Sequence, residues 1–357
     1  MLRFLIVVVA TTLAGACSDD GATVSDAVVV DLVADLSSAD LAPADSAPDS
    51  GPLADLPVAD GAADTGPDAP AAGPAAPLFA SSASYAITVS GSNDPADVYY
   101  PTPPDLATGG YAFPVVLLLQ GAKVDKQHYS KVAGLIARYG FVVVVPNHQS
   151  LMGMFMELSV IPAVLAQMKT EAASATSPVA GAVDTGKLGL VGHSYGGVVG
   201  LYAIQEICQI PFCFGAFKRP AELMGGAFYG TNMKPPIGPI PKIDNHGIAT
   251  ALIQGDLDGK SLLADAQTTY NNIQQPPRAL VTVAGANHYG ICDINNPSGA
   301  DADPKAPTLA QGVANETVAR WAAMYLRAHL LGEAAALDYV YQSGDALDPN
   351  VTVAGVK

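Results

Sequence analysis

The chain has 357 residues, of which 50% are hydrophobic and only 14% are charged, and its formal net charge is −16. Twelve of its 33 acidic residues lie between residues 18 and 80, where no Lys or Arg occurs, so residues 81–357 have a net charge of only about −5. Binding nucleic acid requires clusters of Lys and Arg, and no basic residue occurs between Arg3 and Lys123. We therefore expect no nucleic-acid partner.

Residues 1–17 have the pattern of a signal peptide. Arg3 precedes an apolar run over residues 4–16, which is shorter than the ~20 residues that a membrane-spanning helix needs. The run ends in small residues before Cys17 and resembles a bacterial lipobox, although Leu13 lies four residues before the cysteine instead of three. We expect export and attachment to the outer membrane or cell surface through lipid on Cys17, with ordinary secretion as the alternative.

The segment 18–80 is expected to be a disordered linker. Asp recurs every four to six residues among Ala, Pro, Ser and Gly, and Phe79 is the first aromatic residue after the signal. Such a segment cannot bury enough apolar surface to offset the entropy lost on ordering. Calcium binding by the acidic repeat is an alternative reading, but the repeat lacks the glycine-punctuated pattern of a calcium loop.

From residue 81 to residue 357 the pattern predicts one α/β domain. Continuous apolar runs are typical of parallel strands that helices cover on both faces, and helical periodicity appears between them. The expected strands cover residues 85–89, 97–100, 113–119, 141–146, 187–191, 224–229, 249–253 and 280–283. The expected helices cover residues 127–139, 153–172, 195–208 and 308–331. This alternation predicts a mostly parallel central sheet with helices on both faces.

The strongest chemical motif is the sequence Gly-His-Ser-Tyr-Gly over residues 192–196, which matches G-x-S-x-G. It follows an expected strand and precedes an expected helix, which is the setting of a nucleophile elbow. The flanking glycines permit a sharp turn, and the turn would expose the Ser194 hydroxyl. The same turn would place the backbone N–H of Tyr195 at a helix start, where it can stabilise an oxyanion.

A nucleophilic serine requires a base and an acid that orients it, and for this turn type the chain order is Ser, acid, His. His288 follows the last expected strand on a loop flanked by Gly285 and Gly290, so we predict that it is the base. Asp256 and Asp258 follow the preceding strand. Because they are two residues apart on an extended loop, only one of them can face His288.

Three further features surround this set. The loop after strand 113–119 contains Gly121 and Ala122, whose backbone N–H groups are candidate oxyanion donors beside that of Tyr195. An exported chain meets an oxidising compartment, and Cys208 and Cys213 can bridge if Pro211 turns the chain, which leaves Cys292 unpaired. The loop 293–303 is rich in oxygen ligands, and it is read as a solvated loop, with a calcium site as the alternative.

Together these segments resemble α/β-hydrolases of the branch that contains chlorophyllases, bacterial cutinases and polyester hydrolases. The matching stretches are 98–102, 113–121, 139–146, 192–197 and the loops of Asp258 and His288. The resemblance implies an α/β-hydrolase fold without a cofactor. We also expect no metal site and a monomeric protein. The resemblance also implies hydrolysis of small-molecule or polymeric carboxylic esters through an acyl-enzyme. Because the family's acid stands at the end of G-x-x-D, the resemblance favours Asp258 over Asp256, with Asp256 bonding local amides.

The chain departs from the polyester hydrolases around the expected pocket. It has Ala122 where they carry an aromatic residue and Tyr195 where they usually have Met, and its only Trp lies far along the chain. We therefore expect Tyr195, Tyr229 and Tyr289 to line the pocket. The segment 231–246 is too short for a large lid domain. The alternatives are a non-catalytic surface lipoprotein with a hydrolase-like binding domain and, among hydrolases, a polyester hydrolase, a peptidase or a dienelactone-type enzyme.

Overall fold

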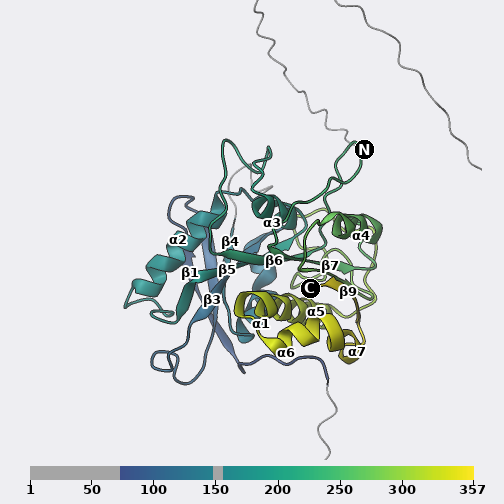
Figure 1. Cartoon of the computed structure of the whole chain (residues 1–357). Coiled ribbons are helices and arrows are strands. Elements are labelled where there is room, and N and C mark those ends of the chain that lie inside the picture. The colour runs from purple at the N-terminus through teal and green to yellow at the C-terminus, as the bar shows by residue number, and fades with distance from the viewer. Residues whose placement is uncertain (1–72, 148–155) are drawn as a thin grey trace, which may run out of the picture. The chain divides into compact units, whose positions relative to one another are not determined.

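The computed structural model describes residues 73–147 and 156–357, and in this part of the chain nine strands form a single sheet (Figure 1). In their order across the sheet the strands are β1 (Ser82–Thr88), β2 (Pro95–Pro101), β4 (Val142–Pro146), β3 (Phe113–Leu119), β5 (Val183–His193), β6 (Leu223–Tyr229), β7 (Ala249–Gly255), β8 (Arg278–Val283) and β9 (Val351–Val356). The strands from β4 to β8 run parallel to one another. The pairs β1–β2, β2–β4 and β8–β9 are antiparallel, so the mostly parallel α/β-hydrolase sheet expected from the sequence is confirmed.

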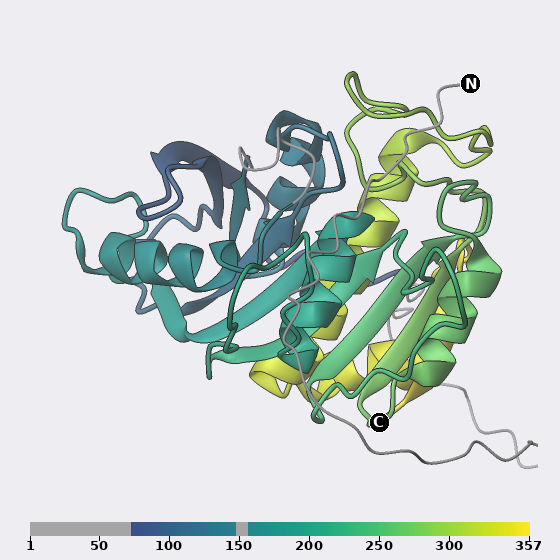
Figure 2. The ribbon, with the colours of Figure 1, turned by 90° about the horizontal axis from the view of Figure 1, so that it is seen from above.

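Helices cover both faces of this sheet. On one face lie α1 (Ser130–Arg138), preceded by the turn η1 (Lys126–Tyr129), and α5 (Gln311–Leu326). On the other face lie α2 (Val160–Ala173), α3 (Tyr195–Gln205) and α4 (Leu263–Asn272). Figure 2 shows the twisted sheet between these two layers. Each face carries its own apolar core, because strands such as β3 and β4 are buried on both sides.

The chain after α5 was only partly predicted. The helix expected over residues 308–331 ends at Leu326 and continues as a π-helical turn, η3 (Arg327–Leu331). It is followed by α6 (Ala334–Asp338), η4 (Tyr339–Ser343), α7 (Gly344–Leu347) and β9. Two elements were not predicted: α4, which buries only three of its ten residues, and the edge strand β9, which is mostly exposed. Both elements carry a weak apolar pattern for this reason.

The described residues begin at residue 73, inside the segment expected to be linker, and pack against the domain. The Phe79 ring packs edge-on against the Phe113 ring, and the Phe79 N–H donates to the Arg138 carbonyl at 2.9 Å. The Tyr139 hydroxyl donates to the Ala75 carbonyl at 2.8 Å. The expected signal peptide, most of the expected linker and the start of the helix expected at 153 lie outside the described residues. Within those residues, every helix is too short or too polar to cross a bilayer.

Candidate active site

Ser194 lies at a sharp turn between β5 and α3. Its φ of +54° and ψ of −121° place a non-glycine residue in a backbone region that L-residues rarely adopt. Two glycines make room for the turn. A Cβ on Gly196 would lie 2.2 Å from the Leu119 carbonyl oxygen, and a Cβ on Gly197 would lie 2.0 Å from Thr231 Oγ1. The turn therefore packs tightly against the end of β3 and the loop after β6, and Ser194 is left half-buried at the carboxyl edge of the sheet.

His288 and Asp258 meet at the same edge, from the loops after β8 and β7. His288 Nδ1 lies 2.8 Å from Asp258 Oδ2, and both side chains are buried. Because a carboxylate only accepts hydrogen bonds, Nδ1 carries the proton in this pair. In the neutral ring Nε2 is then the unprotonated nitrogen, as a base requires. The described contacts include no hydrogen bond of the Ser194 hydroxyl to this imidazole; such bonds often tighten only when substrate binds.

The Asp258 carboxylate is saturated with donors. Oδ1 accepts from the backbone N–H groups of Lys260 and Ser261 at 2.8 and 2.7 Å, and the Gln254 amide donates to Oδ2 at 3.0 Å. Burial acts to raise the pKa of this carboxyl. The hydrogen bond and charge of His288 and the two backbone amides outweigh burial, so the pKa of Asp258 is lowered. Asp258 is therefore ionised at neutral pH.

Asp256, the other carboxylate on this loop, points elsewhere. It is exposed, and its Oδ1 accepts the N–H of Gly285 at 2.7 Å. The two-residue spacing therefore separates the side chains as expected, and it is Asp258 that faces His288.

Asp303 is part of the same cluster, a role that was not predicted from the sequence. Its Oδ2 accepts the backbone N–H of His288 at 2.8 Å, and its Oδ1 accepts the N–H of Gly259 at 3.1 Å. Asp303 thus joins the loop that carries Asp258 to the loop that carries His288. The acidic segment beside His288 was visible in the sequence, but nothing there indicated that Asp303 folds back onto Gly259.

The loop after β3 lies beside the nucleophile, and it offers one of the two candidate oxyanion donors expected from it. The Gly121 N–H donates to the Tyr129 hydroxyl at 2.8 Å, so it is not available as an oxyanion donor. The Ala122 N–H makes no hydrogen bond to any other described residue, and Ala122 lines the same cavity as Ser194. Tyr195 is the first residue of α3, where backbone N–H groups are not used by the helix itself. Ala122 and Tyr195 remain the candidate donors.

A family model for chlorophyllase matches residues 89–217, a range that includes the β3 loop and the Ser194 turn. Over these residues the chain is similar to chlorophyllases, a family of the α/β-hydrolase superfamily, and the similarity supports a chlorophyllase-like hydrolase. No curated protein matches it. The matched range ends before Asp258 and His288, so this similarity does not reach the second half of the hydrolase's candidate site.

A cavity of about 230 Å³ lies over the Ser194 turn of the hydrolase. It is lined by Ala122, Ser194, Tyr195, Lys260, His288 and Tyr289, among others. A larger hollow of about 380 Å³ between α1, α5 and β1 contains none of these residues. The cavity therefore brings together the serine, the imidazole and the candidate oxyanion donor Ala122.

Of the three tyrosines expected in the pocket, the structure places two there. Tyr195 is 46% exposed, and the Tyr289 hydroxyl donates to the Asp301 carbonyl. Tyr229 is buried instead, and its hydroxyl donates to the Asn287 carbonyl. Its hydroxyl occupies the space that a Cβ on Gly290 would need. Tyr229 supports the His288 loop from within the core, so its assignment to the pocket was wrong.

The loop 293–303 uses its carboxylates within the hydrolase. Asp293 accepts from the Ser130 hydroxyl and from the Lys131 N–H, at 2.5 and 2.9 Å. Asp301 forms an exposed ion pair with Lys123 at 3.6 Å. Across the described ranges, no group of three or more His, Cys, Asp or Glu side chains is arranged to hold a metal ion.

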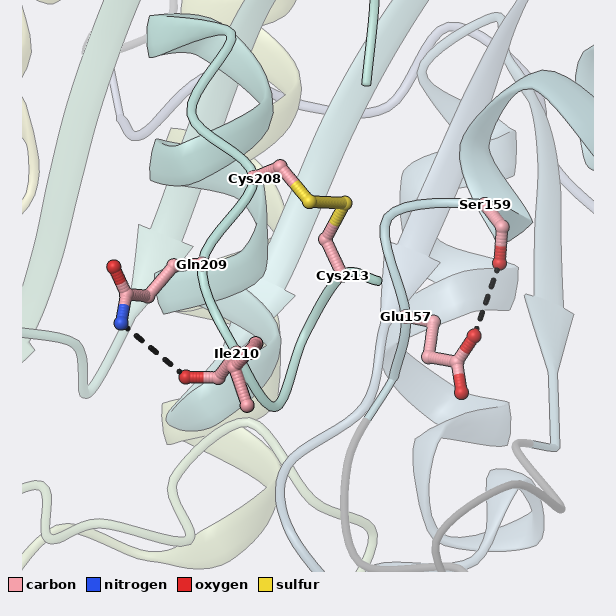
Figure 3. The surroundings of a disulfide bond; sticks show 6 residues. All are labelled: Glu157, Ser159, Cys208, Gln209, Ile210 and Cys213. Carbon is pink, nitrogen blue, oxygen red and sulfur yellow. Dashed lines mark hydrogen bonds between the residues drawn. A yellow bond between two sulfur atoms is a disulfide. The ribbon is translucent and has the colours of Figure 1, made fainter. Parts of the chain in front are cut away.

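A disulfide joins Cys208 and Cys213, the pair expected from the sequence (Figure 3). Cys292 is free and buried. The bridge closes a loop after α3 that lies beside the segment entering α2, where the Leu158 N–H donates to the Phe212 carbonyl at 2.9 Å. The Phe212 ring also lies 5.9 Å from the Tyr195 ring. The closed loop thus supports one wall of the cavity. Cys17, the expected lipidation site, lies outside the described residues.

Proposed function

We propose that the protein is a serine hydrolase that cleaves carboxylic esters through an acyl-enzyme. The observation that carries this proposal is the buried His288–Asp258 hydrogen bond beside the cavity that Ser194 lines. This pair leaves the imidazole Nε2 as the proton acceptor for a serine in the same cavity. A binding protein built on this scaffold would have no use for a saturated, ionised carboxylate beneath that imidazole.

The mechanism follows from these groups. His288 Nε2 takes the Ser194 proton as Oγ attacks the ester carbonyl carbon, and the carbonyl electron pair moves onto oxygen. The N–H groups of Ala122 and Tyr195 stabilise that oxyanion. Asp258 stabilises the imidazolium, which then protonates the leaving alcohol. Water deprotonated by His288 attacks the acyl-enzyme, and the proton returns to Ser194 as the acid leaves.

The size of the cavity favours small acyl groups. Pockets for drug-sized ligands usually measure about 300–1,000 Å³, and this cavity measures about 230 Å³. We therefore propose a preference for short-chain esters. The segment 231–246 forms no helix, which is consistent with a site without a large lid.

A labelling experiment tests the reaction class. The wild-type protein should react with a fluorophosphonate probe at Ser194 and hydrolyse p-nitrophenyl acetate or butyrate much faster than the laurate ester. A Ser194→Ala variant should do neither. A folded wild-type protein that neither takes up the probe nor hydrolyses any ester of the series would favour the non-catalytic alternative. Rapid cleavage of polyester film or of peptide substrates would instead move the assignment to those classes.

We also propose that the protein is exported and anchored through lipid on Cys17, because small residues precede this cysteine at the end of the apolar run. The acidic segment that follows would then space the hydrolase from the membrane. Mass spectrometry of the membrane fraction should find diacylglycerol on Cys17, and a Cys17→Ser variant should lose it. A mature chain that starts elsewhere would refute the proposal.

A further inference from the structure

Three hydrogen bonds in the interior connect the loop after β3, the end of β5 and the loop after β8, which are three of the segments that form the candidate site. The Gly121 N–H lies 2.8 Å from the Tyr129 hydroxyl, that hydroxyl lies 2.9 Å from His193 Nδ1, and His193 Nε2 lies 2.9 Å from the His288 carbonyl oxygen. The Tyr129 and His193 side chains are completely buried. The chain of bonds thus runs from the loop after β3, across the end of β5, to the loop after β8.

Chemistry fixes the direction of each bond. The His288 carbonyl can only accept, so His193 Nε2 carries a hydrogen, and in a neutral ring Nδ1 must then accept. The Tyr129 hydroxyl therefore donates to Nδ1 and accepts the N–H of Gly121 with its oxygen. Burial lowers the pKa of His193 to about 3, so the ring stays neutral at physiological pH.

The surrounding packing holds this arrangement in place. A Cβ on Gly121 would lie 2.7 Å from His193 Nδ1, so only glycine allows the β3 loop to approach the ring. On its other side the His193 ring packs against the His288 ring, with the centroids 4.8 Å apart. The buried thiol of Cys292 also contacts the Tyr129 hydroxyl. Displacing His193 or Tyr129 would therefore move both neighbouring loops.

The two ends of this series of hydrogen bonds lie next to groups that stabilise the transition state. The Gly121 amide is adjacent in sequence to Ala122, whose N–H is the candidate oxyanion donor. The His288 carbonyl belongs to the residue that receives the serine proton. An oxyanion forms only after attack, so a shift of Ala122 would weaken transition-state binding more than substrate binding.

We propose that Tyr129 and His193 are positioning residues, which hold the Ala122 amide and the His288 backbone in place around Ser194 through this hydrogen-bonded chain. The inference rests on the proposed esterase function. Neither residue contacts the reacting atoms in this role; each acts through the loop that it holds.

The first test replaces Tyr129 by Phe, which removes one hydroxyl and keeps the ring. We expect kcat for p-nitrophenyl butyrate to fall by about 10- to 100-fold, somewhat less than the loss of an oxyanion donor itself, with KM changed by less than about threefold. A trifluoromethyl ketone joins its carbonyl carbon to Ser194 Oγ and places an oxyanion in the hole. Its affinity should fall in parallel with kcat/KM.

The matched control is Tyr325→Phe. Tyr325 is equally buried, and its hydroxyl donates to the Pro277 carbonyl at 3.1 Å, away from the site. This variant should lose about as much thermal stability as Tyr129→Phe, but its kcat should stay unchanged. If Tyr129→Phe behaves like the control, with kcat and ketone affinity within threefold of wild type, the hydroxyl has only a structural role and the proposal is wrong.

A second variant keeps the test decisive if Tyr129→Phe is poorly folded. His193→Gln breaks the same chain at its centre and should lower kcat at least as much. The double variant should have a kcat only slightly below that of the more impaired single variant, because either substitution alone already interrupts the series of hydrogen bonds. If the fold-loss in kcat of the double variant equals the product of the two single losses, the proposal is wrong. A wild-type protein that cleaves no ester would overturn the proposed function and this inference with it, whereas an active wild type with unimpaired variants would overturn this inference alone.

Discussion

Replacing Asp258 by Asn would test the assignment of the orienting acid. Every described partner of this carboxylate is an N–H group: those of His288, Gln254, Lys260 and Ser261. An Asn side chain must point its NH₂ group at one pair of these donors, whichever way it turns. With NH₂ toward His288, the imidazole must carry its proton on Nε2, which is the wrong tautomer for a base.

The expected loss can be estimated from that tautomer change. In serine hydrolases this substitution lowers kcat by about 10⁴-fold, which corresponds to about 5.4 kcal/mol of transition-state stabilisation. The bond that would be lost here is 2.8 Å long, buried and formed to an ionised acceptor, so we expect the same order of magnitude. The change should appear in kcat measured with p-nitrophenyl butyrate on protein shown to be folded by circular dichroism.

The matched control is Asp256→Asn, on the same loop and two residues away. Asp256 is exposed and, among the described contacts, its carboxylate bonds only the Gly285 amide, so its replacement should keep kcat within about tenfold, a barrier change near 1.4 kcal/mol. The opposite pattern would refute the assignment of Asp258. Equal small losses in both variants would show that the His288–Asp258 bond does not contribute to turnover.

Three further predictions concern stability. Because the pKa of His193 is about 3 in the folded protein and about 6.5 when unfolded, the unfolded chain binds more protons between these values. The free energy of unfolding should therefore fall by up to about 4–5 kcal/mol from pH 6.5 to pH 3, and urea titrations should show a shallower fall for His193→Gln. Gly197→Ala forces a Cβ toward Thr231 Oγ1 and should destabilise the fold by about 1–3 kcal/mol, measured as a lower Tm; adding Thr231→Ala should cost less than the sum of the two changes. Replacing Cys208 and Cys213 together by Ser should cost about 2 kcal/mol in a denaturant titration, since the bridge closes a short loop; an unchanged midpoint would show that the bridge adds no stability.

The features that the sequence predicted are those encoded by local pattern. The Ser194 turn needs glycines at fixed positions around one residue, and the buried strands are continuous apolar runs. The separation of Asp258 from Asp256 follows from the two-residue repeat of extended backbone. Each of these depends on residues close together in the chain.

The features of the site that were missed depend on tertiary contacts made by individual side chains. The Gly121 N–H was expected to serve the oxyanion hole, but the Tyr129 hydroxyl from the next helical turn takes it. Tyr229 was expected in the pocket, but the missing Cβ of Gly290, far along the chain, gives its ring a place in the core. Asp303 joins loops 15 and 44 residues away. No local pattern indicates which of these partners meet.

The disulfide loop has a consequence for how the protein is produced. Phe212 lies inside the loop closed by Cys208 and Cys213, and its ring packs against Tyr195, which lines the cavity. In a reducing host cytoplasm the Cys208–Cys213 disulfide does not form. The loop that carries Phe212 would then be less constrained, and so would the wall of the cavity that it supports. Substrate profiles measured on cytoplasmic recombinant protein would then describe a looser acyl site than that of protein matured in an oxidising compartment.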